Sequence, residues 1–352
     1  MNFGMTVSRV GDIEMAVWAE KQGYDFCWAF DSPMIRSNIW SLMTLLADRT
    51  ERIRIGSGVA VPGLRMAPVT ANAIATINAL APGRTFLGVG TGNTAMRAMG
   101  QRPQRFADFE ADIRVIRKLL DGEPVEYVAR GKTHTIEFQS LELDWLNLDD
   151  RIPIQIGGFG PKAIALAGEI GDGLITSLPR GGTLPEIRAN LLRGAERTGR
   201  SLEGFESTAL VSVLLLRDGE TLHSNRPVQE IGSSVMVNLH YLYDLFLETG
   251  AEPPAFAQNI WDDYVAFRTE RDANRDPSEA HGNHYGTLDP EEARFVTPEL
   301  IQTFAIAGHP GEVIEQLNDL ENQGLTGICF IPPAGREQDL YEEFATQVIA
   351  AL

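Results

Sequence analysis

The apolar and polar residues of this chain follow two alternating spacings from one end to the other. Short apolar runs predict buried strands, and the stretches between them, with apolar residues three and four positions apart, predict helices. Because each expected strand is followed by a helix, the pattern predicts an α/β fold, a (β/α)8 TIM barrel that forms a single domain over residues 1–352. The expected strands are 3–8, 24–30, 53–59, 85–89, 154–156, 174–176, 209–216 and 327–331, and the expected helices are 12–22, 38–48, 68–80, 105–120, 161–169, 184–197, 310–322 and 337–351.

Two segments depart from this alternation. Residues 122–150 alternate around Arg130-Gly131, which predicts a surface hairpin. Residues 218–297 form a long insertion between the seventh strand and its helix, where a connection of about 2–6 residues is usual. We expect this insertion, with helix-like runs at 228–249 and 256–271, to cover the carboxyl end of the barrel; a dimer contact or a core of its own is the alternative. Its candidates to contact a substrate are His240, Tyr241, His281 and His284.

Glycines gather where the expected strands end, at 56–58, 88–92 and 157–160. A residue without a Cβ lets the backbone approach a ligand closely, although tight turns alone would also account for the pattern. In a barrel of this kind the chemistry lies at the carboxyl ends of the strands. The fifth strand ends in glycines, Pro161 and Lys162, where amides at a helix start could hold a phosphate; a plain helix cap is the alternative.

Composition removes several classes of function. A formal net charge of -18 argues against a nucleic-acid or anionic-membrane partner. The chain has no long apolar run and no signal-peptide pattern, and its two cysteines, Cys27 and Cys329, lie in apolar runs, so we expect a cytoplasmic protein with free thiols. His281 and His284 could hold a metal ion, but no further His or Cys stands near them in sequence, so we expect no metal.

Three blocks, residues 53–93, 152–177 and 296–330, resemble the luciferase-like flavin and deazaflavin oxidoreductases. The resemblance is strongest to the coenzyme F420-dependent branch, which includes methylenetetrahydromethanopterin reductases and sugar-phosphate dehydrogenases. It implies a non-prolyl cis peptide bond at Gly58-Val59 behind the ring of the coenzyme, and a homodimer that acts on a small molecule. The cofactor-binding residues that it implies are Asp31, Gly58, Val59, Val61, Thr91, Gly92, Phe159, Gly160, Lys162, Ala163 and Ser177.

The chain departs from these relatives where their acid and base stand. The sugar-phosphate dehydrogenases have His and Glu where this chain has Ser32 and Asn93, and the methylenetetrahydromethanopterin reductases have acidic residues at the positions of Thr6 and Asn93. Asp31, Ser32 and Asn93 are therefore the catalytic candidates. We expect hydride transfer between coenzyme F420 and a small organic substrate. The alternatives are a monooxygenase that uses reduced flavin mononucleotide (FMN) and a flavin-binding protein without catalysis.

Overall fold

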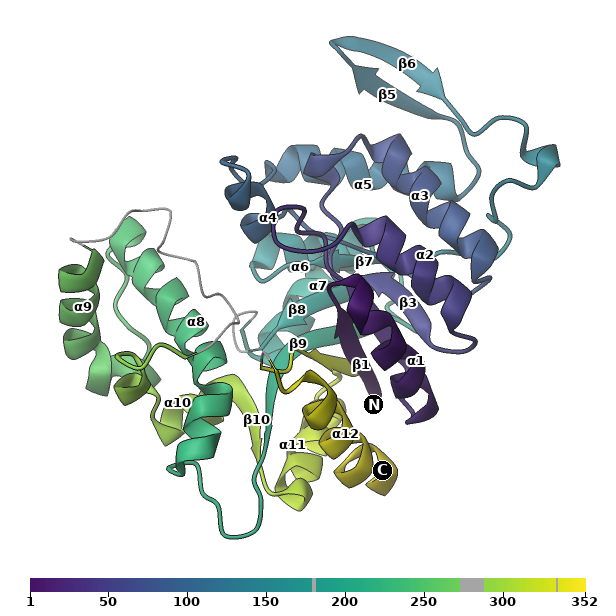
Figure 1. Cartoon of the computed structure of the whole chain (residues 1–352). Helices are drawn as coiled ribbons and strands as arrows, with labels where there is room; N and C mark the ends of the chain where they lie inside the picture. Colours follow the sequence, from purple (N-terminus) through teal and green to yellow (C-terminus); the bar gives the residue numbers. More distant parts are fainter. Residues whose placement is uncertain (179–181, 273–287, 334) are drawn as a thin grey trace. The chain divides into compact units, whose positions relative to one another are not determined.

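The computed structural model describes residues 1–178, 182–272, 288–333 and 335–352 (Figure 1). Within these residues the main sheet has the strand order β10-β9-β11-β1-β2-β3-β4-β7-β8, and a further pairing of β9 with β8 closes eight strands into a barrel. The expected (β/α)8 barrel is confirmed. Its strands are β1 (Asn2–Val7), β2 (Phe26–Ala29), β3 (Arg54–Ser57), β4 (Thr85–Val89), β7 (Ile154–Gly157), β8 (Gly173–Ser177), β9 (Glu206–Leu215) and β11 (Gly327–Phe330), with β10 (Ala305–Gly308) paired to β9 in parallel.

The helices follow from the expected periodicity and from local capping. Helix α2 starts where the Asn38 side chain accepts hydrogen bonds from the amides of Trp40 (3.1 Å) and Ser41 (3.2 Å). The helices are α1 (Ile13–Lys21), α2 (Ile39–Arg49), α3 (Ala67–Leu80), α4 (Asn93–Ala98), α5 (Phe106–Leu120), α6 (Pro161–Ile170), α7 (Leu184–Thr198), α8 (Asn225–Thr249), α9 (Gln258–Asp272), α10 (Pro298–Phe304), α11 (Pro310–Asn322) and α12 (Glu337–Gln347).

The chain divides into two compact units. Unit 1 comprises Met1–Leu210 and Leu320–Cys329, and unit 2 comprises Val211–Asp319 and Phe330–Leu352. The single domain expected from the sequence stays a prediction. The described residues include no helix long and apolar enough to span a membrane.

The interior of the barrel in unit 1 is filled by aromatic rings opposite glycines. A Cβ on Gly4 would lie 2.1 Å from the Phe26 ring, and one on Gly56 would lie 2.0 Å from the Phe86 ring. The two rings pack edge to face, with centroids 6.3 Å apart. Because side chains occupy the interior, ligand chemistry is left to the ends of the strands.

Helices α6 and α7 cross with backbone nearly in contact. A Cβ on Gly194 would lie 1.8 Å from the carbonyl oxygen of Ala165, so the helices cannot keep their separation around a larger residue. We expect Gly194→Ala to lower the free energy of unfolding by about 2 kcal/mol, because overpacking outweighs the gain in helix propensity. Urea denaturation measures this. Gly11→Ala, where a Cβ meets no atom within 4 Å, is the control, and equal midpoints for both variants would contradict the packing argument.

A buried carboxylate fixes the turn before β3. Glu20 Oε1 accepts hydrogen bonds from the amides of Glu51 (2.9 Å), Arg52 (2.6 Å) and Ile53 (2.8 Å). Burial by itself would raise the pKa of Glu20, but these amides outweigh it and the pKa lies below its ordinary value of 4.5.

The stabilisation from Glu20 should therefore depend on pH. A carboxyl group with a lowered pKa in the folded state stabilises the fold above the unfolded pKa, and the contribution is lost as the pH falls through the folded value. We expect Glu20→Gln to cost about 2 kcal/mol at neutral pH and progressively less below pH 4.5. Denaturation across this pH range measures the difference. Glu14→Gln, on the exposed side of α1, should change little, and a cost of Glu20→Gln that does not vary with pH would contradict the assignment.

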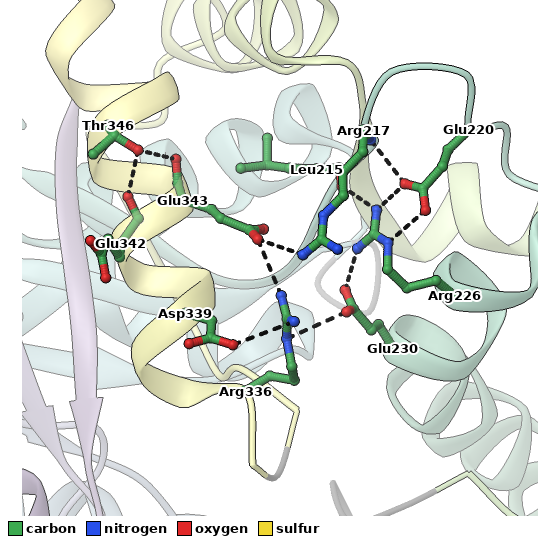
Figure 2. Close-up of polar contacts among 10 residues, drawn as sticks. All are labelled: Leu215, Arg217, Glu220, Arg226, Glu230, Arg336, Asp339, Glu342, Glu343 and Thr346. Carbon is green, nitrogen blue, oxygen red and sulfur yellow. Dashed lines mark hydrogen bonds and ion pairs between the residues drawn. The ribbon is translucent and has the colours of Figure 1, made fainter.

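Unit 2 has its own core and its own ion-pair network. The core combines aliphatic side chains with aromatic residues of α8, α9 and α10, among them Tyr243, Trp261, Tyr264 and Phe304. Figure 2 shows the network, in which hydrogen bonds from Arg226 lower the pKa of Glu220 to about 2. It ties the start of α8 to α12 within unit 2. Its members are Arg217, Glu220, Arg226, Glu230, Arg336, Asp339 and Glu343.

Most expected elements are present, and three were missed. The hairpin around Arg130-Gly131 is confirmed as β5 (Val125–Ala129) paired antiparallel with β6 (Lys132–Ile136), and it extends away from the helices of unit 1 (Figure 1). The missed elements are α4, α10 and β10. Helix α10 runs directly into β10 without a glycine or proline between them, so the sequence pattern shows no boundary there.

Candidate functional site

The carboxyl ends of β3, β4 and β7 meet around the side chain of Val59 in unit 1. The Gly58-Val59 peptide bond is cis, at the position that the resemblance implies. Beyond it, Ala60 donates to the carbonyl of Gly88 (2.7 Å) and accepts from the amide of Gly90 (3.0 Å). Val59 lies between two glycines, because a Cβ on Gly90 would be 2.6 Å and one on Gly157 2.9 Å from its methyl groups. Glycines are thus required here for close packing of the three strand ends.

An indole ring lies directly behind this segment. A Cβ on Gly58 would be 2.6 Å from Cγ of Trp28, which points from β2 into the barrel. The ring is 1% exposed, and its Nε1 is buried without a hydrogen-bond partner among the described residues. Trp28 therefore supports the back of the segment and closes the barrel beneath it.

Asp31, the acidic candidate at the end of β2, is held by other protein groups. Its side chain is 1% exposed, and both carboxylate oxygens accept hydrogen bonds from Arg65, at 2.6 and 2.8 Å. Oδ2 also accepts from the amide of Val61 at 3.0 Å. The Arg65 guanidinium lies over the Trp40 ring, 5.7 Å from its centroid. Asp31 thus fixes the segment that follows β3, and we interpret it as a positioning residue.

The end of β4 leads into α4 next to Val61. Gly92 has a φ of 78°, which favours glycine, and a Cβ there would lie 2.4 Å from Cγ1 of Val61. Thr91 is half-buried and its carbonyl accepts from the amide of Gln104 at 3.0 Å. Asn93 is exposed, and its Oδ1 accepts from Nε of Arg97 at 2.7 Å. Asn93 therefore presents an amide donor at the surface.

The loop after β7 offers backbone donors at the start of α6. The amides of Phe159, Gly160 and Lys162 have no acceptor among the described residues, as is usual for the first turn of a helix. Ala163 is among the cofactor-binding residues that the resemblance implies, but its amide is already bonded to the carbonyl of Gly160 at 3.1 Å. The Phe159 ring is 45% exposed, and Lys162 is exposed. An anion at this helix start could bind up to three amides and one ammonium group.

Two serine candidates lie at the carboxyl ends of separate strands, Ser32 shortly after β2 and Ser177 at the end of β8. Ser32 is half-buried, and its carbonyl accepts from the amides of Ile35 (2.9 Å) and Arg36 (2.8 Å). Ser177, the last residue of β8, is 7% exposed. The structure thus places both at strand ends of unit 1.

The loops at this end of unit 1 are locally positive although the whole chain carries -18. Four exposed cations in the segments that follow β2, β4 and β7, two on loops and two in the helices α4 and α6, have no carboxylate partner among the described residues. A local excess of positive charge favours anionic ligands despite the opposite net charge of the protein. These cations are Arg36, Arg97, Arg102 and Lys162.

The candidates in the long insertion belong to unit 2. His240 Nε2 lies 2.9 Å from Oε1 of Glu292, which also pairs with Arg271 at 3.1 Å. Tyr241 is 47% exposed. His281 and His284 lie outside the described residues. Among the residues that are described, no cluster of His, Cys, Asp and Glu could hold a metal ion. Contact of the insertion with a substrate stays a prediction.

Sequence reasoning missed three side chains of the site. They are Trp28 behind Gly58, Arg65 on Asp31, and Arg97 on Asn93. An available signal was the absence of any Asp or Glu from residues 90–107, a stretch that contains three arginines. Such a run in an acidic protein indicates a surface for anions.

Comparison with known proteins agrees with this arrangement. The profile of the luciferase-like monooxygenase family matches residues 11–327. The chain belongs to this family. Among family members, the 5,10-methylenetetrahydromethanopterin reductase of Archaeoglobus fulgidus is 28% identical over 325 residues, which cover 91% of this chain and 89% of the relative. An F420-dependent glucose-6-phosphate dehydrogenase of Mycobacterium avium is 27% identical, with 94% and 90% covered.

Solved structures of this luciferase-like fold span the whole chain. The coenzyme F420-dependent tetrahydromethanopterin reductase from Methanopyrus kandleri aligns with a TM-score of 0.71 and 21% identity, covering 99% of each chain. An FMN-bound oxygenating subunit of 3,6-diketocamphane monooxygenase from Pseudomonas putida aligns with a TM-score of 0.61 and 16% identity, covering 100% of this chain and 99% of the other. These similarities establish a shared fold.

Proposed function

We propose that this family member is a coenzyme F420-dependent oxidoreductase that transfers a hydride between the deazaflavin and a small organic substrate. The observation that carries the proposal is the match over about nine-tenths of the chain to an F420-dependent glucose-6-phosphate dehydrogenase. The fold shared with a coenzyme F420-dependent tetrahydromethanopterin reductase supports it. Local features of unit 1 agree with it. The loops at the carboxyl ends of the strands are positive, and the tail of F420 carries a phosphate and glutamates.

The residues present fit such a coenzyme. Gly58 packs against Trp28, and Gly90 and Gly157 pack against Val59, so the strand ends carry no side chains of their own at these positions, which suits a flat ring laid against the backbone. The amides of Phe159 and Gly160, with Lys162, would hold the phosphate. The coenzyme supplies the hydride chemistry when it is bound.

The protein's own residues would then bind and orient the reactants. Arg65 and Asp31 hold the Val61 amide, and through it the segment behind the ring. Ser32 and Asn93 would orient the substrate by hydrogen bonds. Both are neutral, and Asp31 is engaged by Arg65, so we propose that no side chain among these three exchanges a proton with the substrate. Such a site would take an electrophilic carbonyl or double bond as the hydride acceptor, with the proton that completes the reduction supplied by water.

A monooxygenase that uses reduced FMN is the second candidate. The family as a whole is described as monooxygenases, and the structure of the diketocamphane enzyme contains FMN. The same amides after β7 could hold the single phosphate of FMN. A flavin-binding protein without catalysis is a third reading. A homodimer and a cytoplasmic location also remain part of the proposal.

Turnover distinguishes these candidates. Reduced F420 is mixed anaerobically with the protein and small ketones or enones, and the return of the oxidised deazaflavin absorbance is followed. A parallel aerobic reaction with reduced FMN records oxygen uptake. The proposal expects oxidation of F420 that depends on the acceptor, with no uptake above the protein-free rate. Oxygenated product from reduced FMN, with inert F420, would contradict it.

A further inference from the structure

Two exposed side chains of the short helix α4, Asn93 and Arg97, are joined by a hydrogen bond. Nε of Arg97 can only donate, so its 2.7 Å hydrogen bond to Asn93 identifies the facing atom as the carbonyl oxygen Oδ1. The amide nitrogen Nδ2 of Asn93 is thereby directed away from Arg97, with two hydrogens to donate. The two Nη atoms of Arg97 have no acceptor among the described residues.

These donors are connected to the candidate coenzyme site through direct contacts. Asn93 follows Gly92, which packs against Val61, and the Val61 amide is bonded to Asp31. Asn93 and Arg97 therefore lie at the same strand ends as the residues proposed to hold the ring. Residues 90–107 contain no Asp or Glu, so no carboxylate of this stretch competes for the guanidinium.

We propose that Asn93 and Arg97 together bind a carboxylate on the substrate, so that the hydride acceptor is an oxo acid or an unsaturated acid. This rests on the proposed function and names its substrate class. A planar guanidinium with two unoccupied nitrogens binds a carboxylate in a bidentate manner, and the Asn93 amide adds a neutral donor. An acid at position 93 would repel such a substrate. Asparagine does not.

Binding rather than turnover provides the test, because the natural substrate is unidentified. Pyruvate is compared with methyl pyruvate, and crotonate with crotonamide, by calorimetric titration of the protein saturated with oxidised F420. We expect each acid to bind about tenfold more tightly than its neutral partner, the range of a charge-assisted hydrogen bond. Arg97→Gln should abolish this preference, and Asn93→Asp should reverse it. The control is Arg193→Gln on the exposed face of α7, which removes the same charge.

The titrations distinguish binding of a substrate carboxylate from binding of the coenzyme tail at Arg97. Equal affinity for the acids and their neutral partners in the unmodified protein would overturn it. So would an Arg97→Gln variant that loses affinity for F420 rather than for the acids, since the anion would then be the tail of the coenzyme. The titrations are repeated without coenzyme and with FMN. Absence of F420 binding would contradict the proposed function while the preference for acids remains measurable.

Discussion

Replacing Asp31 with asparagine should lower the free energy of unfolding by about 3 kcal/mol and weaken F420 binding roughly tenfold or more. The reason is the burial of the pair: the carboxylate is 1% exposed and its arginine partner 18% exposed. Removal of one charge leaves the Arg65 cation buried without its partner. Asparagine also keeps only one of the two acceptor oxygens, so a donor of Arg65 or the Val61 amide is left facing an NH2 group. Chemical denaturation and a coenzyme titration measure the two effects.

A double-mutant cycle separates positioning from proton transfer. If Asp31 acts through Arg65, Arg65→Gln alone should lower coenzyme affinity and turnover about as much as Asp31→Asn does. The double variant should then lose little more of either than each single variant. Arg49→Gln on the exposed side of α2 is the control for loss of an arginine. A loss of kcat in Asp31→Asn that Arg65→Gln does not share, with coenzyme affinity retained, would instead assign Asp31 to the chemical step.

Replacing Gly160 with proline should weaken F420 binding by about ten- to hundredfold, because it deletes one amide donor to the phosphate. The local backbone nearly allows the exchange: Gly160 has φ -89° and ψ 156°, and an extended ψ suits the residue before Pro161. A fluorescence titration with oxidised F420 measures the affinity, and circular dichroism checks the fold.

Gly160→Ala is the matched control for this variant. It keeps the amide, and its Cβ meets no atom within 4 Å, so binding should stay within about twofold of the unmodified protein. Lys162→Gln, which removes the exposed ammonium group, provides a second measure if the proline variant is unstable. Unchanged F420 affinity in both Gly160→Pro and Lys162→Gln would place the phosphate elsewhere.

The sequence predicted the fold best at positions where the backbone geometry favours a particular type of residue. The strands of the barrel followed from short apolar runs, because parallel strands are buried on both faces. Glycines marked the strand ends because Gly90 and Gly157 leave space only for Val59. Each of these signals lies within a few consecutive residues, so it could be recognised without the fold.

Side-chain partners were harder to predict, because they depend on the folded chain. Asp31 is a predicted coenzyme contact, and the sequence did not show that its carboxylate also binds Arg65, which is 34 positions away. No local pattern links these two residues. The Ala163 amide was expected to donate to a ligand, yet it closes the first turn of α6 on the Gly160 carbonyl. Whether a backbone amide such as that of Ala163 bonds to the protein or stays available to a ligand depends on the local backbone conformation, which the sequence does not show directly.

A comparative titration distinguishes F420 from FMN as the coenzyme of this protein. Purified protein stripped of small molecules is titrated with F420 and with FMN, each in its oxidised and reduced state, and binding is followed by absorbance and fluorescence. We expect micromolar binding of F420 and binding of FMN weaker by about tenfold. Tight binding of reduced FMN with no measurable affinity for F420 would contradict it and favour a monooxygenase.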